Sequence, residues 1–129
     1  MDDVSYYSTI PDLLEFDIGY IRTSLQYAED WKGTLKELVK CNPNLLIFSD
    51  LSVGDIKTFL TLQSWGSQDI PYWFINKDEL VEFVLSFGYK LTCDKISGYI
   101  KDREGWESCK NYPREFQITC LFDLVFERV

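Results

Sequence analysis

Five side chains that can bind a ligand follow a short apolar stretch near the start of the chain. The stretch "FDIGYI", residues 16–21, predicts a strand, and the polar side chains among the six residues after it are Arg22, Thr23, Ser24, Gln26 and Tyr27. Ligands of open α/β sheets bind beyond the carboxyl ends of the strands, so these residues form a candidate binding turn. The alternative is a helix cap, in which Thr23 or Ser24 accepts hydrogen bonds from the first N–H groups of the next helix.

A carboxylate lies at the end of the next apolar run. The run "NLLIFSDL", residues 44–51, predicts a strand buried on both faces, and Asp50 lies near its carboxyl end. A carboxylate in this place can orient an acceptor hydroxyl or act as a general base. The alternative is that Asp50 begins a loop and hydrogen-bonds its own backbone. We interpret Asp17, at the start of the preceding strand, as structural.

Aromatic side chains and an amide gather in or beside a stretch predicted to be irregular, residues 52–75. They are Gln63, Trp65, Tyr72 and Trp73. Loops of this length are uncommon in compact domains unless they bind something. Aromatic rings with an amide suit stacking on a sugar or another planar-faced acceptor, and the alternative is a small aromatic core that pins the loop. Trp106 lies in a polar connection, and its context gives it no role.

The composition limits the chemistry that is open to this chain. With 129 residues, 46% of them apolar, it is long enough for one domain with a real core. The sequence contains no histidine, which removes Ser-His and Cys-His catalysis and the commonest metal ligand. The four cysteines are too widely spaced for a zinc site or a CxxC pair, so we expect free thiols and no metal. Chemistry must rely on carboxylates, hydroxyls, lysines or a cofactor.

Charge and hydropathy exclude two classes of partner. The net charge of −8 disfavours binding to nucleic acid and to anionic membrane surfaces. No apolar run approaches the roughly 18 residues that a membrane span needs. From the acidic, polar start "MDDVSYYSTIPDL" we expect no signal peptide. We therefore expect a cytoplasmic protein with neither nucleic-acid nor membrane partners.

Apolar periodicity predicts two helices. The helix over residues 29–41 has apolar residues at i, i+4, i+7 and i+8 counted from Trp31, on one face. The helix over residues 76–88 begins with Asn76 and Glu79 at capping-box spacing. The predicted strands cover residues 4–9, 16–21, 44–51, 89–96 and 116–129.

This order of elements predicts the fold class. Strands that alternate with helices indicate an α/β fold with a mostly parallel, Rossmann-like sheet. The last two strands follow each other without a helix, so we expect a C-terminal antiparallel β-hairpin. We expect residues 1–129 to form a single domain.

Several stretches match a known enzyme family. They are "FDIGYIRTSLQYAEDW" with the buried strand ending in Asp, "TLQ" (61–63), "PYWF" (71–74) and "FGYKL" (87–91). In these stretches the chain resembles the C-terminal half of class I S-adenosylmethionine-dependent methyltransferases. It is most similar to methyltransferases encoded with bacterial surface-polysaccharide genes. The resemblance covers most of residues 4–129.

The resemblance implies S-adenosylmethionine as cofactor. The turn of Arg22, Thr23, Ser24, Gln26 and Tyr27 would border its methyl and adenosine side. A small-molecule acceptor, such as a sugar, would lie on the side of the aromatic stretch, with Asp50 as the catalytic carboxylate.

The chain departs from the family pattern on the side of the site that holds the methionine part of the cofactor. The Gly-rich turn that holds the methionine part of the cofactor in such enzymes has no counterpart, because the sequence contains no G-x-G. The segment 4–9 matches the family's third strand, so the first two strands are missing. We expect half of a methyltransferase fold: a truncated piece of a longer protein, part of a split gene or a shortened paralogue.

The missing strands leave an edge to explain. In the family, the strand over residues 18–21 pairs with the absent first strand, and an unpaired apolar edge invites association. We therefore expect a homodimer or an N-terminal partner chain at this edge, unless residues 2–15 cover it. Two functions stay open: the acceptor-side half of a methyltransferase, or a non-enzymatic α/β interaction module that has lost the cofactor site.

Overall fold

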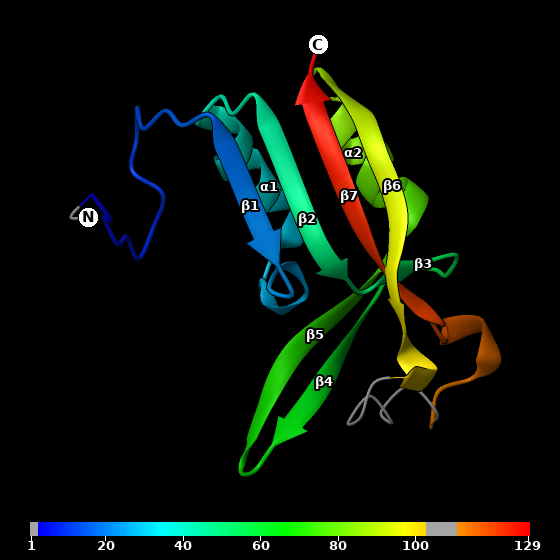
Figure 1. Cartoon of the computed structure of the whole chain (residues 1–129). Coiled ribbons are helices and arrows are strands. Elements are labelled where there is room, and N and C mark those ends of the chain that lie inside the picture. The colour runs from blue at the N-terminus through cyan, green and yellow to red at the C-terminus, as the bar shows by residue number, and fades with distance from the viewer. Residues whose placement is uncertain (1–2, 103–110) are drawn as a thin grey trace.

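A four-stranded mixed sheet forms the body of the computed structural model, which describes residues 3–102 and 111–129. The strand order is β1-β2-β7-β6. Both helices pack behind this sheet in the view of Figure 1. In chain order these elements are β1 (Ile18–Arg22), α1 (Trp31–Lys40), β2 (Leu45–Leu51), α2 (Lys77–Leu85), β6 (Tyr89–Tyr99) and β7 (Cys120–Arg128).

The expectation of a mostly parallel sheet is not confirmed. Of the three pairings in this sheet, β1 with β2 is parallel, whereas β7 runs antiparallel to both β2 and β6. The reason is that the C-terminal hairpin supplies half of the sheet and inserts β7 next to β2. The predicted antiparallel pairing of the last two strands is present, with two register shifts along it.

The prediction of an irregular stretch over residues 52–75 is wrong. This segment forms a second, three-stranded sheet of order β3-β5-β4, whose strands are β3 (Val53–Gly54), β4 (Phe59–Trp65) and β5 (Gln68–Asn76). Gly66, at φ +59°, makes the tight turn between β4 and β5, and the hairpin projects away from the main sheet (Figure 1). Pro71 is tolerated because β3 pairs with β5 only at Ile75 and Asn76, so one side of β5 is open at the proline.

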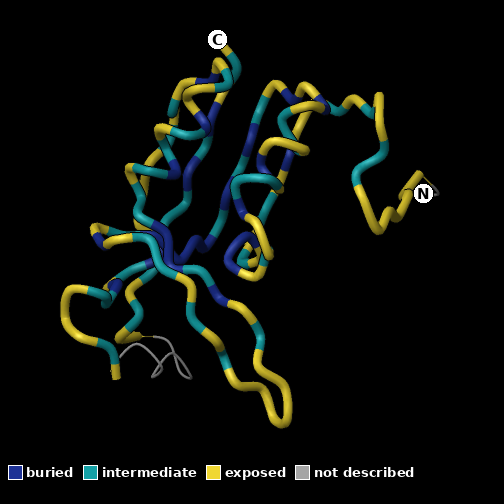
Figure 2. Tube along the Cα trace, turned by 180° about the vertical axis from the view of Figure 1, so that it is seen from behind, coloured by how far each residue is buried: buried dark blue, intermediate teal, exposed yellow. Residues whose placement is uncertain are grey.

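The predicted strand over residues 4–9 is also wrong. Residues 3–17 contain no strand, and the segment runs away from the sheet in both views (Figures 1 and 2). Tyr6 is 91% exposed. The β-favouring residue types of this segment need a neighbouring strand to pair with, since β propensity depends on context more than helix propensity does.

Both predicted helices are present and slightly shorter than expected. Asp30 precedes α1 as its N-cap and accepts a hydrogen bond from the Gly33 N–H at 3.0 Å, so the helix begins at Trp31. Asn76 caps α2 by accepting from the Glu79 N–H at 2.8 Å, as the capping-box spacing predicts. Gly88, at φ +87°, follows the end of α2 in the left-handed conformation.

The larger core cluster lies between the main sheet and its two helices, and a smaller one, around Tyr72, Phe74 and Leu121, lies at the base of the hairpin (Figure 2, dark blue). Leu46, Phe48, Leu124 and Phe126 on β2 and β7 are fully buried, and the rings of Phe48 and Phe126 meet edge to face at 5.7 Å. Burying a side chain of this size contributes about 1.5–3 kcal/mol. The core therefore fixes the relation of β2, β7 and the helices.

Short 3-10 helices complete the described chain: η1 (Leu25–Tyr27), η2 (Ile100–Asp102) and η4 (Arg114–Phe116). The predicted polar connection between β6 and β7 is only partly described, and Trp106 and Cys109 lie outside the described residues. No helix within residues 3–102 and 111–129 is long and apolar enough to cross a membrane.

Replacing Asn76 by alanine is expected to lower the free energy of unfolding by about 2 kcal/mol. The change removes the cap of α2 and leaves the Ile56 carbonyl without the Asn76 Nδ2 donor, 2.7 Å away. Urea titration followed by circular dichroism measures this. Asn44→Ala is the control, because its exposed side chain makes one long hydrogen bond of 3.4 Å to Asp17. Equal losses in the two variants would contradict the role assigned to Asn76.

Candidate functional site

The parallel pairing of β1 and β2 brings two predicted site residues together. Arg22 is in register with Ser49, and the Thr23 N–H donates to the Ser49 carbonyl at 3.2 Å. Beyond this point Arg22 Nη2 lies 3.4 Å from Asp50 Oδ2. The Arg22 side chain is 64% exposed and that of Asp50 12%, so the ion pair lies at the surface with its carboxylate turned inward.

The backbone of Asp50 departs from the regular strand. The pairing of β2 with β7 shifts register between Phe48 and Leu51, and Asp50 adopts φ +54° in this bulge. Aspartate is among the residues that tolerate the left-handed region. The Asp50 N–H donates to Asp123 Oδ1 of β7 at 3.0 Å. Bulges of this kind re-aim a side chain, and here the carboxylate points toward the end of β1.

The predicted binding turn folds as the short helix η1. Ser24 occupies its N-cap position, but its side chain makes no capping hydrogen bond, so the capping alternative is wrong for Ser24. Thr23 adopts φ +44°, which turns the chain sharply out of β1. Leu25 and Gln26 point inward and are buried, whereas Ser24 and Tyr27 are exposed.

Tyr27 joins this turn to the projecting hairpin. Its hydroxyl donates to Gln63 Oε1 at 3.2 Å, and its ring meets Tyr72 edge to face at 5.1 Å. The Tyr72 hydroxyl is in turn 2.6 Å from Ser52 Oγ, in a buried contact. Residues from the predicted cofactor side and the predicted acceptor side therefore meet directly. Ser52 is absent from the predicted site, since a serine within an apolar run carries no signal.

We call the contact of Tyr27 with Gln63 and Tyr72 the junction. Two buried polar atoms on the elements that meet there have no hydrogen-bond partner within the described chain. Gln26 is only 4% exposed, and its Oε1 lacks a donor; the same is true of the Trp73 indole Nε1, which lacks an acceptor. A buried polar atom without a partner costs free energy, so such atoms are rare. Gln26 Oε1 is thus a buried acceptor and Trp73 Nε1 a buried donor whose hydrogen-bonding capacity is unused within the described chain.

Trp65 does not join the other predicted site residues. It lies at the far end of β4, opposite Gln68, and is 63% exposed. This end of β4 is the tip of the projecting hairpin, away from the carboxyl ends of β1 and β2 (Figure 1).

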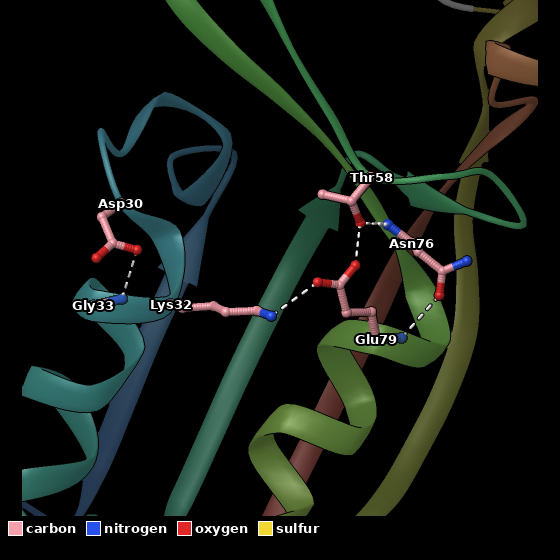
Figure 3. A network of polar contacts seen from close by, with 6 residues as sticks. All are labelled: Asp30, Lys32, Gly33, Thr58, Asn76 and Glu79. Carbon is pink, nitrogen blue, oxygen red and sulfur yellow. Dashed lines mark hydrogen bonds and ion pairs between the residues drawn. The ribbon is translucent and has the colours of Figure 1, made fainter.

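A polar network holds the hairpin base against both helices (Figure 3). Thr58 accepts from the Asn76 N–H at 2.8 Å and donates to the Glu79 carboxylate. Glu79, on α2, also pairs with Lys32 of α1 at 2.9 Å. Sequence patterns do not predict the contributions of Thr58 and Lys32, because these residues are far from Glu79 in sequence.

The same network sets the ionisation of Glu79. Partial burial alone would raise the pKa of this carboxyl. The hydrogen bonds from Thr58 and Lys32, together with the positive charge of Lys32, outweigh burial and lower the pKa below its usual value.

Two hollows lie away from the predicted site residues. One, of about 720 Å³, separates residues 7–16 from α1, and carries Glu29, Asp30 and Glu37 on its wall. The other, of about 500 Å³, lies between the start of α2 and residues 117–122. None of the predicted site residues lines either hollow.

The site offers acid–base and hydrogen-bonding groups. Within residues 3–102 and 111–129, no three His, Cys, Asp or Glu residues are placed to hold a metal ion. Cys41, Cys93 and Cys120 are free thiols, as expected. Burial, helped by the nearby Glu37 carboxylate, raises the pKa of the Cys41 thiol and makes it a poor nucleophile. The chemistry available at the junction is that of Asp50, two tyrosine hydroxyls and two amides.

Comparison with known proteins identifies the fold. A scan against protein-family models finds no match, and a search of curated proteins finds none. Among solved structures, the chain is similar to a crystal structure of a proposed S-adenosylmethionine-dependent methyltransferase from Listeria monocytogenes, with a TM-score of 0.62 and 6% sequence identity over 89% of this chain. The chain spans 62% of the length of that protein. At this identity the likeness concerns the fold alone, and the chain has a methyltransferase-like α/β fold.

The lowered pKa of Glu79 predicts how stability depends on pH. A carboxyl whose pKa is lower in the folded chain stabilises the fold above its unfolded pKa, and this stabilisation is lost as pH falls through the folded pKa. Glu79→Gln is therefore expected to be less stable than the wild type at pH 7, by no more than about 1 kcal/mol for so exposed a pair, with the difference shrinking in acid. Urea titrations at neutral and acidic pH measure it. Glu82→Gln, whose exposed side chain lies outside the network, is the control; a Glu79 effect that is independent of pH would contradict the assignment.

Gln26→Leu is expected to leave the stability of the ligand-free chain unchanged or to raise it, by up to about 1 kcal/mol. Leucine is similar in size and removes the buried oxygen that lacks a donor. Thermal and urea unfolding measure the change. A loss of more than about 2 kcal/mol would mean that Gln26 is a structural residue whose amide supports the fold.

Proposed function

We propose that this chain is the acceptor-side half of an S-adenosylmethionine-dependent methyltransferase fold. The observation that carries the proposal is the junction at the carboxyl ends of β1 and β2, where Tyr27 of the turn contacts Gln63 and Tyr72 of the hairpin. Ligands of open α/β sheets bind at this edge. The methyltransferase-like fold supports S-adenosylmethionine as the cofactor that would bind beside the junction.

The turn after β1 fits one side of the cofactor. Gln26 Oε1 is a buried acceptor in need of a donor, and the ring of Tyr27 is 40% exposed and can stack on a planar base. Arg22, Thr23 and Ser24 complete this side. S-adenosylmethionine supplies an electrophilic methyl group when it is bound, so the protein's task is to position and orient.

The acceptor lies on the side of the hairpin in this proposal. Gln63 and Tyr72 present an amide and a ring toward the turn, whereas Trp73 lies on the other face of the hairpin and Trp65 at its tip. Asp50 takes a proton from an acceptor hydroxyl, and Arg22, at 3.4 Å, orients its carboxylate. A sugar or another small metabolite with hydroxyl groups fits these side chains, in keeping with the resemblance to methyltransferases of surface-polysaccharide gene clusters.

A second candidate is an α/β interaction module that has kept the fold and lost cofactor binding. The observation that favours it is the lack of a G-x-G in the sequence, together with the 62% coverage of the similar structure. In that case residues 1–129 act through their surfaces, and the junction at Tyr27 only holds the hairpin in place.

Titration calorimetry with S-adenosylmethionine separates the two candidates. We expect binding on the order of micromolar for the wild-type chain and about tenfold weaker binding for Gln26→Leu, because one hydrogen bond is lost. Leu62→Ala, on the exposed face of the hairpin, is the matched control and should bind like the wild type. No heat with the wild-type chain would contradict cofactor binding by this chain alone and favour the interaction module.

A further inference from the structure

β1 has an open backbone edge. Within the described residues its one neighbour is β2. The Thr23 N–H donates to Ser49, and the Asp17 carbonyl accepts from the Leu45 N–H, so the odd-numbered residues of β1 direct their backbone groups toward β2. Backbone groups alternate in direction along a parallel strand, and those of Ile18, Tyr20 and Arg22 therefore point away from the sheet.

The side chains of the same strand form an exposed apolar surface. Ile18 is 54% exposed and Tyr20 is 58% exposed, on the face opposite the two helices. In register beside them on β2 lie Leu45 and Ile47, which are half-buried. An edge that combines unpaired backbone groups with exposed apolar side chains is a template for another strand.

We propose that a second copy of this chain pairs with this edge, β1 against β1 in antiparallel orientation, around a two-fold axis at Tyr20. This register places Tyr20 opposite Tyr20 of the second copy and Ile18 opposite its Arg22. All three outward-facing residues of each strand then find a backbone partner. The pairing joins the two four-stranded sheets into one, and identical surfaces meet as a closed dimer requires.

The charges along β1 favour this orientation over a parallel one. Carboxylates of Glu15 and Asp17 precede the strand, and the guanidinium of Arg22 ends it. Antiparallel pairing sets the acidic end of each strand beside the basic end of the other. No like charges oppose each other within residues 18–22, although the whole chain carries −8. The local charges therefore complement each other where the copies meet.

The test uses the whole 129-residue chain and charge substitutions at Tyr20, the position that would face its own copy. Sedimentation velocity of the wild type should show the mass rising toward twice the 15.2-kDa chain with concentration. Tyr20→Lys and Tyr20→Glu should each stay monomeric because like charges face each other, and a mixture of the two should recover the dimer. Circular dichroism checks that both variants fold.

A second pair of variants tests the register at another exposed position. Ile18→Glu should tighten the dimer several-fold, since it faces Arg22 of the second copy, and Ile18→Lys should weaken it. Leu62→Lys and Leu62→Glu, at a position 61% exposed on the hairpin, are the controls and should leave the mass unchanged. A wild type that stays at one chain mass at every concentration would overturn the proposal. A dimer that survives Tyr20→Lys, or variants that do not combine on mixing, would overturn it equally.

Discussion

Burial of one face of the four-stranded sheet by both helices is the constraint on which the rest of this structure depends. Both helices pack on the same face of the four-stranded sheet (Figure 1), and Leu46, Phe48, Leu124 and Phe126 of β2 and β7 belong to one core cluster with residues of these helices. A second, smaller cluster of buried residues, including Tyr72, Phe74 and Leu121, joins the base of the hairpin to β7, whereas Ile18 and Tyr20 of β1 stay exposed. The same arrangement brings the carboxyl ends of β1 and β2 to one place, because these two strands are the parallel pair.

The candidate site is assembled from three separate departures from regular structure. Thr23 and Asp50 both adopt positive φ at the ends of their strands, and the hairpin leaves the main sheet beyond Ser52. Thr23 turns η1 toward the hairpin, and Asp50 turns its carboxylate toward Arg22. Strained backbone gathers at functional sites more often than elsewhere. The unpartnered oxygen of Gln26 lies in the same part of the described chain, and packing does not explain it.

The sequence predicted what depends on local patterns and missed what depends on neighbours. Both helices, the strands around Tyr20 and Phe48, and the cap at Asn76 follow from periodicity and capping, which act over a few residues. The predicted strand over residues 4–9 does not form, because its residue types need a neighbouring strand to pair with and the described chain provides none there. The hairpin of β4 and β5 was not predicted, because glycine and proline by residue type alone indicate irregular structure. In the structure Gly66 forms the turn of the hairpin, and Pro71 lies where β5 has an open side. The contacts of Tyr27 with Gln63 and Tyr72 are long-range, and no spacing encodes them.

Arg22 belongs to both of the surfaces that remain open. Its backbone points outward from the β1 edge, whereas its guanidinium pairs with Asp50 at 3.4 Å. The side chain is 64% exposed, so the ion pair alone does not fix its position. A strand that pairs with the β1 edge restrains the Arg22 backbone, and thereby narrows the positions from which the guanidinium can reach Asp50. A strand paired with the β1 edge thus acts on the geometry of the ion pair between Arg22 and Asp50 through the backbone of Arg22.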